Sequence, residues 1–196
     1  SILPFKFVLF NEYQKLIMKV ENDKENLIYD DIVYAEDSIK ILMPPYDAVI
    51  IVKVKESSLV GRYLKEESGI ETAFKAEISD SPKFSSGKKP NIDLSGKYKT
   101  VFRPEKPYPG LGIFKQKGNQ ISGTFRKNTG DTRFLSGIVF GDSILLSTFD
   151  GAHPYLIKAK KIGDTIKGNL YYQSSSITKF WMINDENYEL QNSKEL

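Results

Sequence analysis

The chain has 196 residues, and its 40% hydrophobic and 12% aromatic content is enough to fill a core, which argues against a disordered protein. Its formal charge of +3 comes from 28 Lys and Arg and 25 Asp and Glu that are interspersed, so the charge pattern favours no nucleic-acid partner. The absence of cysteine excludes a disulfide, a thiol nucleophile and a thiolate metal site within these residues. No run of about eighteen apolar residues occurs, so we expect no membrane-spanning helix.

Short segments of alternating apolar and polar residues follow one another along the chain, and turn residues separate them. They fill a first half, about 1–64. The stretch 65–96 is richer in polar, Gly and Pro residues, and we predict a strand at 72–78 followed by a connecting loop. Alternation resumes over 97–184, with turns at 117–120, 128–131, 140–142 and 162–164. The pattern predicts antiparallel strands throughout and no helix of useful length.

The two halves repeat each other. The tripeptide Asp-Ser-Ile that begins at Asp37 recurs at Asp142, a shift of 105 positions. Gly61 of LVGRY recurs as Gly168 of IKGNL, a shift of 107 positions. Further upstream, 4–20 lines up loosely with 111–127. A shift that stays nearly constant through several strands favours duplication over chance.

A glycine flanked two positions away by apolar residues occurs three times, at Gly61, Gly123 and Gly168. Glycine inside a strand weakens it, so this register predicts either a sharp strand bend or the close approach of a neighbouring side chain. Both features allow a sheet to curl and close.

We therefore predict one all-β domain over 1–184, with halves of about 1–64 and 97–184. We expect an antiparallel up-and-down meander of roughly ten to twelve strands that forms a closed or nearly closed calycin-like barrel from the two similar halves. A two-sheet β-sandwich is the alternative. The polar, aperiodic segment 185–196 is predicted to be a linker to a further C-terminal domain.

Five stretches of the sequence carry a resemblance to a known family: TAFKAE (72–77), DLSGKYKTVF (93–102), GIFKQKGNQISGTF (112–125), GDTRFLSG (130–137) and LLSTFDGAHPYLIKAK (145–160). Together they resemble the domain that precedes the thioredoxin-like module in TlpA-like thiol-disulfide oxidoreductases of Bacteroidetes. The likeness covers most of the chain and is densest over 108–160. The sequence differs from the family pattern at Thr132, Thr148 and Pro154.

The resemblance implies an exported protein of the cell envelope or periplasm, with a lipid anchor on the full-length precursor left open. In such relatives the chain continues past a segment like NYEL into a redoxin domain with a Cys-x-x-Cys site. The partner implied is therefore the chain's own C-terminal thioredoxin-like domain or the client of that domain. Because no cysteine is present here, these residues by themselves cannot carry the oxidoreductase activity.

His153 is the only histidine, and with Asp150 it could form a general base oriented by a carboxylate. Catalysis would also need a nucleophile such as Ser147 or Thr148. The alternative is a turn in which Asp150 caps its own backbone. One histidine with scattered carboxylates lacks any metal-ligand spacing, so we predict no metal site and no cofactor.

Three aromatic residues complete the candidate docking or ligand contacts beside Asp150 and His153. Phe149 belongs to the same turn, and Tyr108 lies among turn-forming residues, where a loop contact is expected. Trp181 is interpreted as core or barrel-end packing, or else as a surface for the C-terminal domain.

The resulting functional hypothesis is a non-catalytic scaffold that docks the redoxin domain or its client. The alternative is a barrel that encloses a small apolar or lipid-like ligand. A hydrolase that uses His153 is a third hypothesis.

Overall fold

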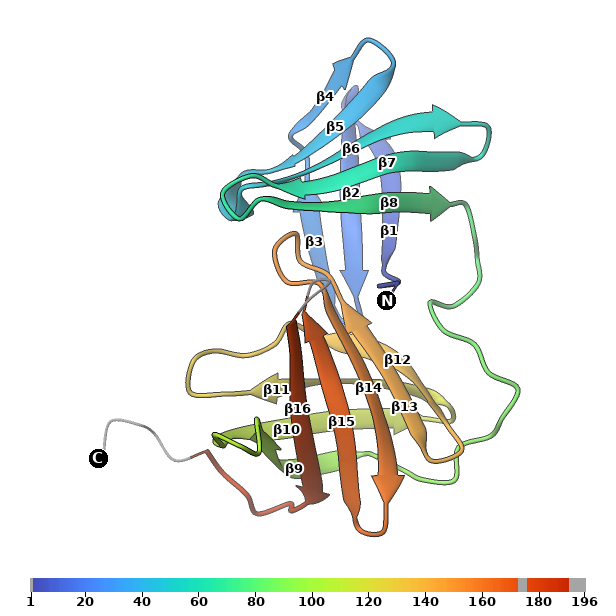
Figure 1. Cartoon of the computed structure of the whole chain (residues 1–196). Helices are drawn as coiled ribbons and strands as arrows, with labels where there is room; N and C mark the ends of the chain where they lie inside the picture. Colours follow the sequence, from blue (N-terminus) through green and yellow to red (C-terminus); the bar gives the residue numbers. More distant parts are fainter. Residues whose placement is uncertain (1, 173–175, 191–196) are drawn as a thin grey trace.

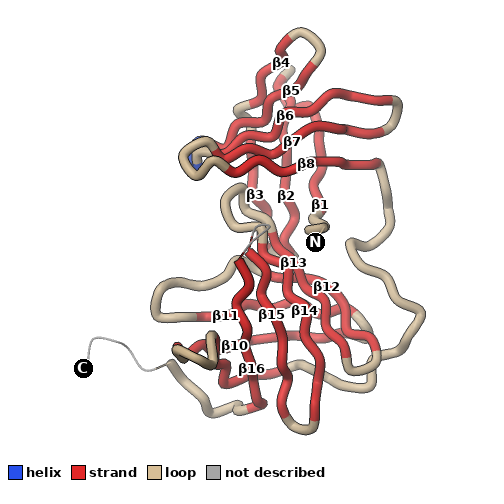
Figure 2. Tube along the Cα trace, in the orientation of Figure 1, coloured by secondary structure: helices blue, strands red, loops and turns tan. Residues whose placement is uncertain are grey.

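The computed structural model describes residues 2–172 and 176–190, and in this part of the chain sixteen β-strands accompany one short 3-10 helix (Figures 1 and 2). The elements are β1 (Lys6–Glu12), β2 (Lys15–Asn22), β3 (Glu25–Tyr29), β4 (Ile32–Ala35), β5 (Ser38–Met43), η1 (Pro44–Tyr46), β6 (Ala48–Lys55), β7 (Ser58–Lys65), β8 (Ile70–Glu77), β9 (Gly96–Phe102), β10 (Tyr108–Lys117), β11 (Gln120–Arg126), β12 (Leu135–Phe140), β13 (Ser143–Thr148), β14 (Tyr155–Ile162), β15 (Thr165–Tyr172) and β16 (Ser176–Asn184). Among the described residues, no helix has the length and apolar character needed to cross a lipid bilayer.

Strands β9 to β16 form a closed eight-stranded barrel, whereas β1–β3 and β4–β8 form two open sheets. The all-β antiparallel prediction and the expected barrel closure are confirmed. The barrel is not built from both halves as predicted, because the second half closes on itself: β9 pairs with β10 on one side and with β16 on the other. The strand predicted at 72–78 is β8, but sixteen strands exceed the ten to twelve expected, since both halves are divided more finely.

Each half has its own apolar core. Four phenylalanine rings, Phe102, Phe114, Phe125 and Phe180, meet inside the barrel with centroids 5.2–5.8 Å apart. Buried aliphatic side chains surround them and fill the interior: Leu94, Ile121, Leu135, Val139, Ile144, Leu146, Ile157, Ile166, Leu170 and Met182. The core of the first half gathers residues of both open sheets, and it also contains Phe149 from the second half.

Two hairpins of the predicted repeat share one register. Glu12 pairs with Lys15 across the β1–β2 turn, as Lys117 pairs with Gln120 across the β10–β11 turn, a shift of 105 positions. The loose alignment of 4–20 with 111–127 is therefore wrong by two positions, because the hairpin pairs fix the register that sequence similarity left uncertain.

Further along the chain the shift changes from 105 to 107 positions. Ala35 pairs with Ser38 and Phe140 with Ser143, at a shift of 105. After the next loop, β6 begins at Ala48 and β14 at Tyr155, at a shift of 107. The loop between β13 and β14 is thus two residues longer than its counterpart between β5 and β6. This longer loop joins the two halves, as described below.

The three repeated glycines lie where neighbouring strands approach closely. A methyl group at Gly61 would be 1.9 Å from the Ile51 carbonyl oxygen, and one at Gly123 would be 2.2 Å from the Ile113 oxygen. A methyl group at Gly168 would lie 2.5 Å from Ala159 Cβ. Close approach therefore accounts for the glycine register, but a side chain is the nearest group only at Gly168, whereas backbone atoms are nearest at Gly61 and Gly123.

Replacing Gly168 with alanine is expected to lower the free energy of unfolding by about 1–3 kcal/mol, because the added methyl group must displace the β14 backbone or the ring of Phe180. Gly87→Ala serves as the control, since a methyl group there would have no atom within 4 Å. Urea denaturation followed by Trp181 fluorescence compares the two variants. Equal stabilities of the two variants would contradict close approach at Gly168.

Candidate functional site

The six-residue loop 149–154 between β13 and β14 rises from the barrel and enters the first half (Figure 1). Its first residue, Phe149, is buried in the core of the first half. The Phe149 ring lies with its centroid 4.4 Å from that of Phe5 and 5.8 Å from that of Tyr63. The loop therefore supplies a core residue to a sheet system in which it has no strand.

Buried polar side chains of the first half bind the backbone of this loop. Asn22 donates from Nδ2 to the Phe149 carbonyl at 2.7 Å and accepts from the Phe149 N–H at 3.3 Å. The Tyr29 hydroxyl donates to the Asp150 carbonyl at 2.7 Å, and the Tyr63 hydroxyl donates to the Gly151 carbonyl at 2.8 Å. Burial raises the pKa of Tyr63 to about 12, so this donor keeps its proton throughout the neutral range. Three successive carbonyls are thus satisfied from the other half.

The carboxylate of Asp150 organises the loop from within. Its side chain is 3% exposed, and its Oδ1 accepts the backbone N–H groups of Ala152 at 3.0 Å and His153 at 2.6 Å. Its Oδ2 accepts from Arg133 Nε at 3.4 Å and lies 3.0 Å from His153 Nδ1. Burial acts to raise the pKa of Asp150, but the hydrogen bonds from His153 and Ala152 outweigh it and hold the pKa below its usual value. The predicted backbone-capping role of Asp150 is confirmed.

Arg133 extends this network to the first half. Its guanidinium donates from Nη1 to Glu25 Oε1 at 2.6 Å and from Nη2 to the Tyr46 hydroxyl at 3.2 Å. One planar group therefore connects Asp150 of the loop with two residues of the first half, a geometry that suits the fixed fork of arginine donors.

His153 lies at the edge of the junction among aromatic rings. Its side chain is 44% exposed, and its ring stacks on Tyr155 with a centroid distance of 5.8 Å. Tyr172 and Tyr46 lie beside it, with ring centroids 6.1 and 6.4 Å away. The structure thus brings together three predicted residues, Phe149, Asp150 and His153, but it surrounds them with groups of the protein itself.

Neither hydroxyl considered as a nucleophile is hydrogen-bonded to His153 in the part of the chain that the structure describes. Ser147 donates from Oγ to the Pro4 carbonyl at 2.6 Å. Thr148 Oγ1 is buried without a hydrogen-bond partner. Within the same residues, no group of three or more His, Asp and Glu side chains is arranged to hold a metal ion. The arrangement at His153 holds the two halves in contact and offers no assembled nucleophile.

Lys83 is a half-buried residue beside β13 that the sequence analysis did not identify. It reaches from the connecting loop to donate from Nζ to the Ser147 carbonyl at 3.0 Å. Burial, together with the nearby charge of Lys6, lowers the pKa of Lys83 to about 8. No sequence signal distinguishes this lysine from the others of the polar loop. Asn22, Arg133 and Tyr63 were missed for the same reason.

The two remaining predicted residues lie on strands of the barrel. Tyr108 is not in a loop as expected: it begins β10, pairs with Phe102 and stacks on that ring at 5.2 Å. Trp181 stands between two core residues, Phe180 and Met182, so strand alternation turns its side chain to the outside of the barrel. The core-packing interpretation of Trp181 is therefore wrong.

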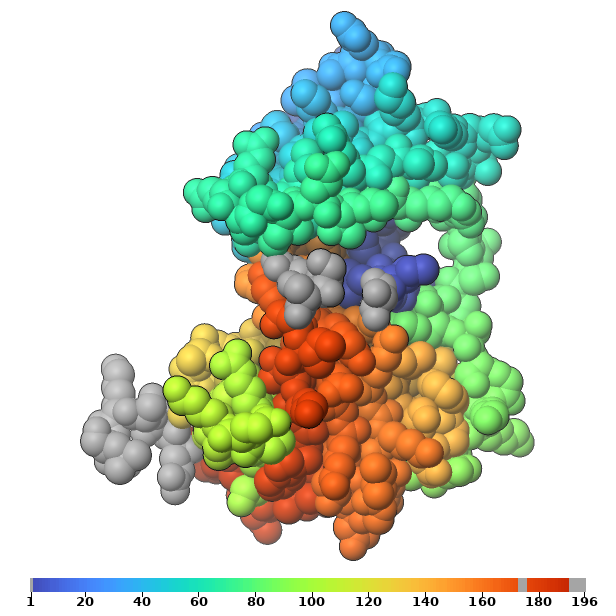
Figure 3. Space-filling view, in the orientation of Figure 1, coloured from blue at the N-terminus to red at the C-terminus, as the bar shows by residue number. Residues whose placement is uncertain are grey.

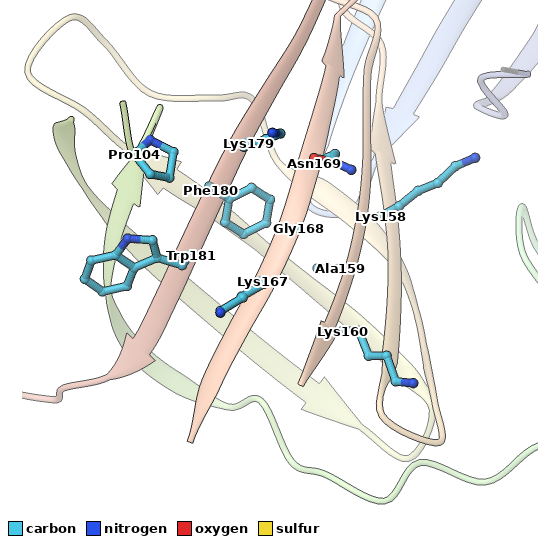
Figure 4. Close-up of a pocket in the computed structure, with 10 residues that line it drawn as sticks. All are labelled: Pro104, Lys158, Ala159, Lys160, Lys167, Gly168, Asn169, Lys179, Phe180 and Trp181. Carbon is cyan, nitrogen blue, oxygen red and sulfur yellow. The ribbon is translucent and has the colours of Figure 1, made fainter. Parts of the chain in front are cut away.

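Trp181 borders a hollow of about 610 Å³ on the outer face of β14–β16 (Figure 4). Four lysines line the same hollow: Lys158, Lys160, Lys167 and Lys179. The pairing of the three strands places Lys158 and Lys179 in one row across the sheet, and Lys160, Lys167 and Trp181 in the next. None of the four lysines forms an ion pair with a described residue. We call this surface the basic groove.

Asp150→Ala is expected to lower the free energy of unfolding by about 2–4 kcal/mol, because it leaves two backbone N–H groups and Arg133 without their acceptor in a buried site. His153→Ala is the control, and a loss below about 1 kcal/mol is expected because that ring is partly exposed. Chemical denaturation measures both. Similar losses in the two variants would contradict the role assigned to the Asp150 carboxylate.

The lowered pKa of Lys83 predicts that the stability of the fold depends on pH. The unfolded chain keeps the lysine proton up to its ordinary pKa near 10.5, whereas the folded chain releases it near 8. Because the unfolded state binds more protons between these values, the free energy of unfolding should rise with pH from about 8 to about 10. The measurement is the difference between wild type and Lys83→Met in denaturation curves across this range, with Lys88→Met as the exposed control. Parallel curves for wild type and Lys83→Met would contradict the burial of this amine.

Comparison with known proteins adds no assignment to this geometry. The chain matches no protein-family model, no curated protein and no solved structure. The function must therefore be argued from the residues and their arrangement.

Proposed function

We propose that this chain is a non-catalytic scaffold and docking module of an exported, envelope-located thiol-disulfide oxidoreductase of the TlpA-like kind. The observation that carries the proposal is that the polar groups around Asp150 bind one another and the loop backbone. Every hydrogen bond of the Asp150 carboxylate goes to Arg133, His153 or the loop backbone, and the loop carbonyls accept from Asn22, Tyr29 and Tyr63. The network around Asp150 and the loop backbone thus connects the two halves.

The packing favours a scaffold over the two other hypotheses. The interior of the barrel is occupied by aromatic and aliphatic side chains, so an enclosed apolar ligand would have to displace them. The hydrolase hypothesis requires a hydroxyl beside His153, and Ser147 is instead bound to the Pro4 carbonyl.

The basic groove is the surface that we assign to docking. Its four lysines are free of ion pairs with described residues, and Trp181 beside them offers an aromatic contact of the kind that anchors interfaces. Strand β16 carries Lys179 and Trp181 and leads directly to residues 185–190, which bind β9 through the Asp185 N–H and the Glu186 carboxylate. A redoxin domain that follows the chain would be tethered to β16, and in this proposal it meets the groove with an acidic surface.

The test uses the polypeptide encoded directly after Leu196, expressed as a separate protein, and an NMR titration against the present chain. We expect binding that weakens at least tenfold in Lys158→Glu/Lys167→Glu, because two favourable charges become repulsive. Lys88→Glu/Lys89→Glu carries the same change of charge in the connecting loop and should alter the affinity less than about twofold.

Three results would overturn the proposal. The first is a gene that encodes no Cys-x-x-Cys domain after Leu196. The second is a downstream domain that causes no shift changes in the chain. The third is equal weakening by the groove and loop variants, which would show a dependence on net charge alone.

A further inference from the structure

The barrel depends on one strand for its closure. Strand β9 pairs along its length with β10, from Tyr108 opposite Phe102 to Phe114 opposite Gly96. On its other side it pairs with β16, from Phe180 to Asn184. Without β9, the remaining strands would form an open meander with two free edges.

Among the described residues, the first half has counterparts of the other barrel strands but none of β9. It also lacks the counterpart of the β11–β12 pairing, because β2 pairs with β3 and β4 belongs to the other sheet. Core-facing positions match at a constant shift: Phe7 and Leu9 of β1 correspond to Gly112 and Phe114 of β10. At the other end of the meander, β8 corresponds to β16. In the described chain β1 pairs only with β2, and β8 pairs only with β7. The backbone groups on the outer edges of β1 and β8 therefore face no strand.

The repeat indicates where the missing strand belongs in the polypeptide. Strand β9 directly precedes β10, and the shift between β10 and β1 is 105 positions. Subtracting this shift from the positions of β9, 96–102, places the counterpart of β9 within the roughly ten residues that precede Ser1. The link would match the short loop 103–107 that joins β9 to β10, so closure would cost little chain entropy.

We propose that the polypeptide directly ahead of Ser1 in the full-length protein forms a β-strand that inserts antiparallel between β1 and β8 and joins the two open sheets of the first half along these edges. Strand β9 pairs with 108–114 on one side, which correspond to 3–9 in the first half. On its other side β9 pairs with 180–184, which correspond to 74–78 because Phe74 lies opposite Gly61 as Phe180 lies opposite Gly168. In the space-filling view, the N-terminal segment lies below β8 (Figure 3). This inference does not depend on the proposed docking function.

The side chains at the two free edges support this assignment. Ile78 continues the core-facing alternation of Phe74 and Ala76, yet it is 89% exposed. Val8, on the outer face of β1, is 41% exposed. An added strand would cover both residues and would pair the free backbone groups of β1 and β8. It would therefore remove both features that make an exposed sheet edge prone to association.

The core also specifies what the added strand should contain. In the barrel, Gly110 and Gly112 leave room for the rings of Phe102 and Phe114. At the matching positions the first half has Phe5, just ahead of β1, and Phe7 in β1, whose ring centroids lie 6.0 and 6.2 Å from that of Phe74. Because these rings already fill the space, the core-facing residues of the inserted strand should be small, namely Gly, Ala, Ser or Thr.

The experiment compares the present chain with one extended upstream by the roughly fifteen residues encoded ahead of Ser1, a length that suits a strand and a short link. Hydrogen exchange followed by mass spectrometry is expected to slow at least tenfold in peptides covering β1 and β8. Exchange in β12–β14 should stay unchanged, which shows that the barrel is folded in both proteins.

A matched control carries the same extension with prolines at two alternate positions of the expected strand. Proline has no N–H to donate, so the protection of β1 and β8 should be lost. The inference is overturned if no such residues are encoded ahead of Ser1, or if the extension leaves the exchange of β1 and β8 unchanged. It is also overturned if the protection grows with protein concentration, because a second copy would then be the partner.

Discussion

The buried carboxylate of Asp150 is the interaction on which the joining of the two halves depends. A carboxylate in an apolar site is costly unless charged or hydrogen-bonded partners surround it, and here the loop backbone, His153 and Arg133 provide them. Arg133 in turn binds Glu25 and Tyr46, so one guanidinium links the Asp150 carboxylate to the first half. A general base at His153 would have to draw on the same carboxylate that maintains this junction.

One difference in loop length between the two similar halves bears directly on how they are joined. The loop after β5 and the loop after β13 occupy equivalent places, but the second is two residues longer and carries the aspartate that folds it back. The two loops face each other across the junction, where Tyr46 of the shorter loop meets Arg133 and the ring of His153. Equivalent segments of a repeat have thus become the two sides of one interface, with different chemistry on each side.

Local features of this fold could be predicted from the sequence, and non-local ones could not. Alternation, turn residues and the repeated Gly61, Gly123 and Gly168 indicate strands and their close approach, because each depends on neighbours within a few positions. The closure of the barrel by the second half alone depends on pairing between strands from its opposite ends, which periodicity does not encode. Arg133 and Glu25 are 108 positions apart, so no local pattern could connect them. The outward position of Trp181, by contrast, follows from its alternation with two core residues.

The charges of this protein divide into two groups according to their exposure. At the junction, Asp150 is almost wholly buried, and its carboxylate fixes the loop whose backbone the first half binds. On the barrel face, Lys158, Lys160, Lys167 and Lys179 remain in water, where an unpaired ammonium carries no desolvation cost. Such lysines contribute little to the stability of the fold. Their clustering in two adjacent rows beside an outward tryptophan is therefore not explained by folding. A carboxylate-rich partner supplies an explanation, because it would gain charge attraction and aromatic contact from a surface that the fold itself does not use.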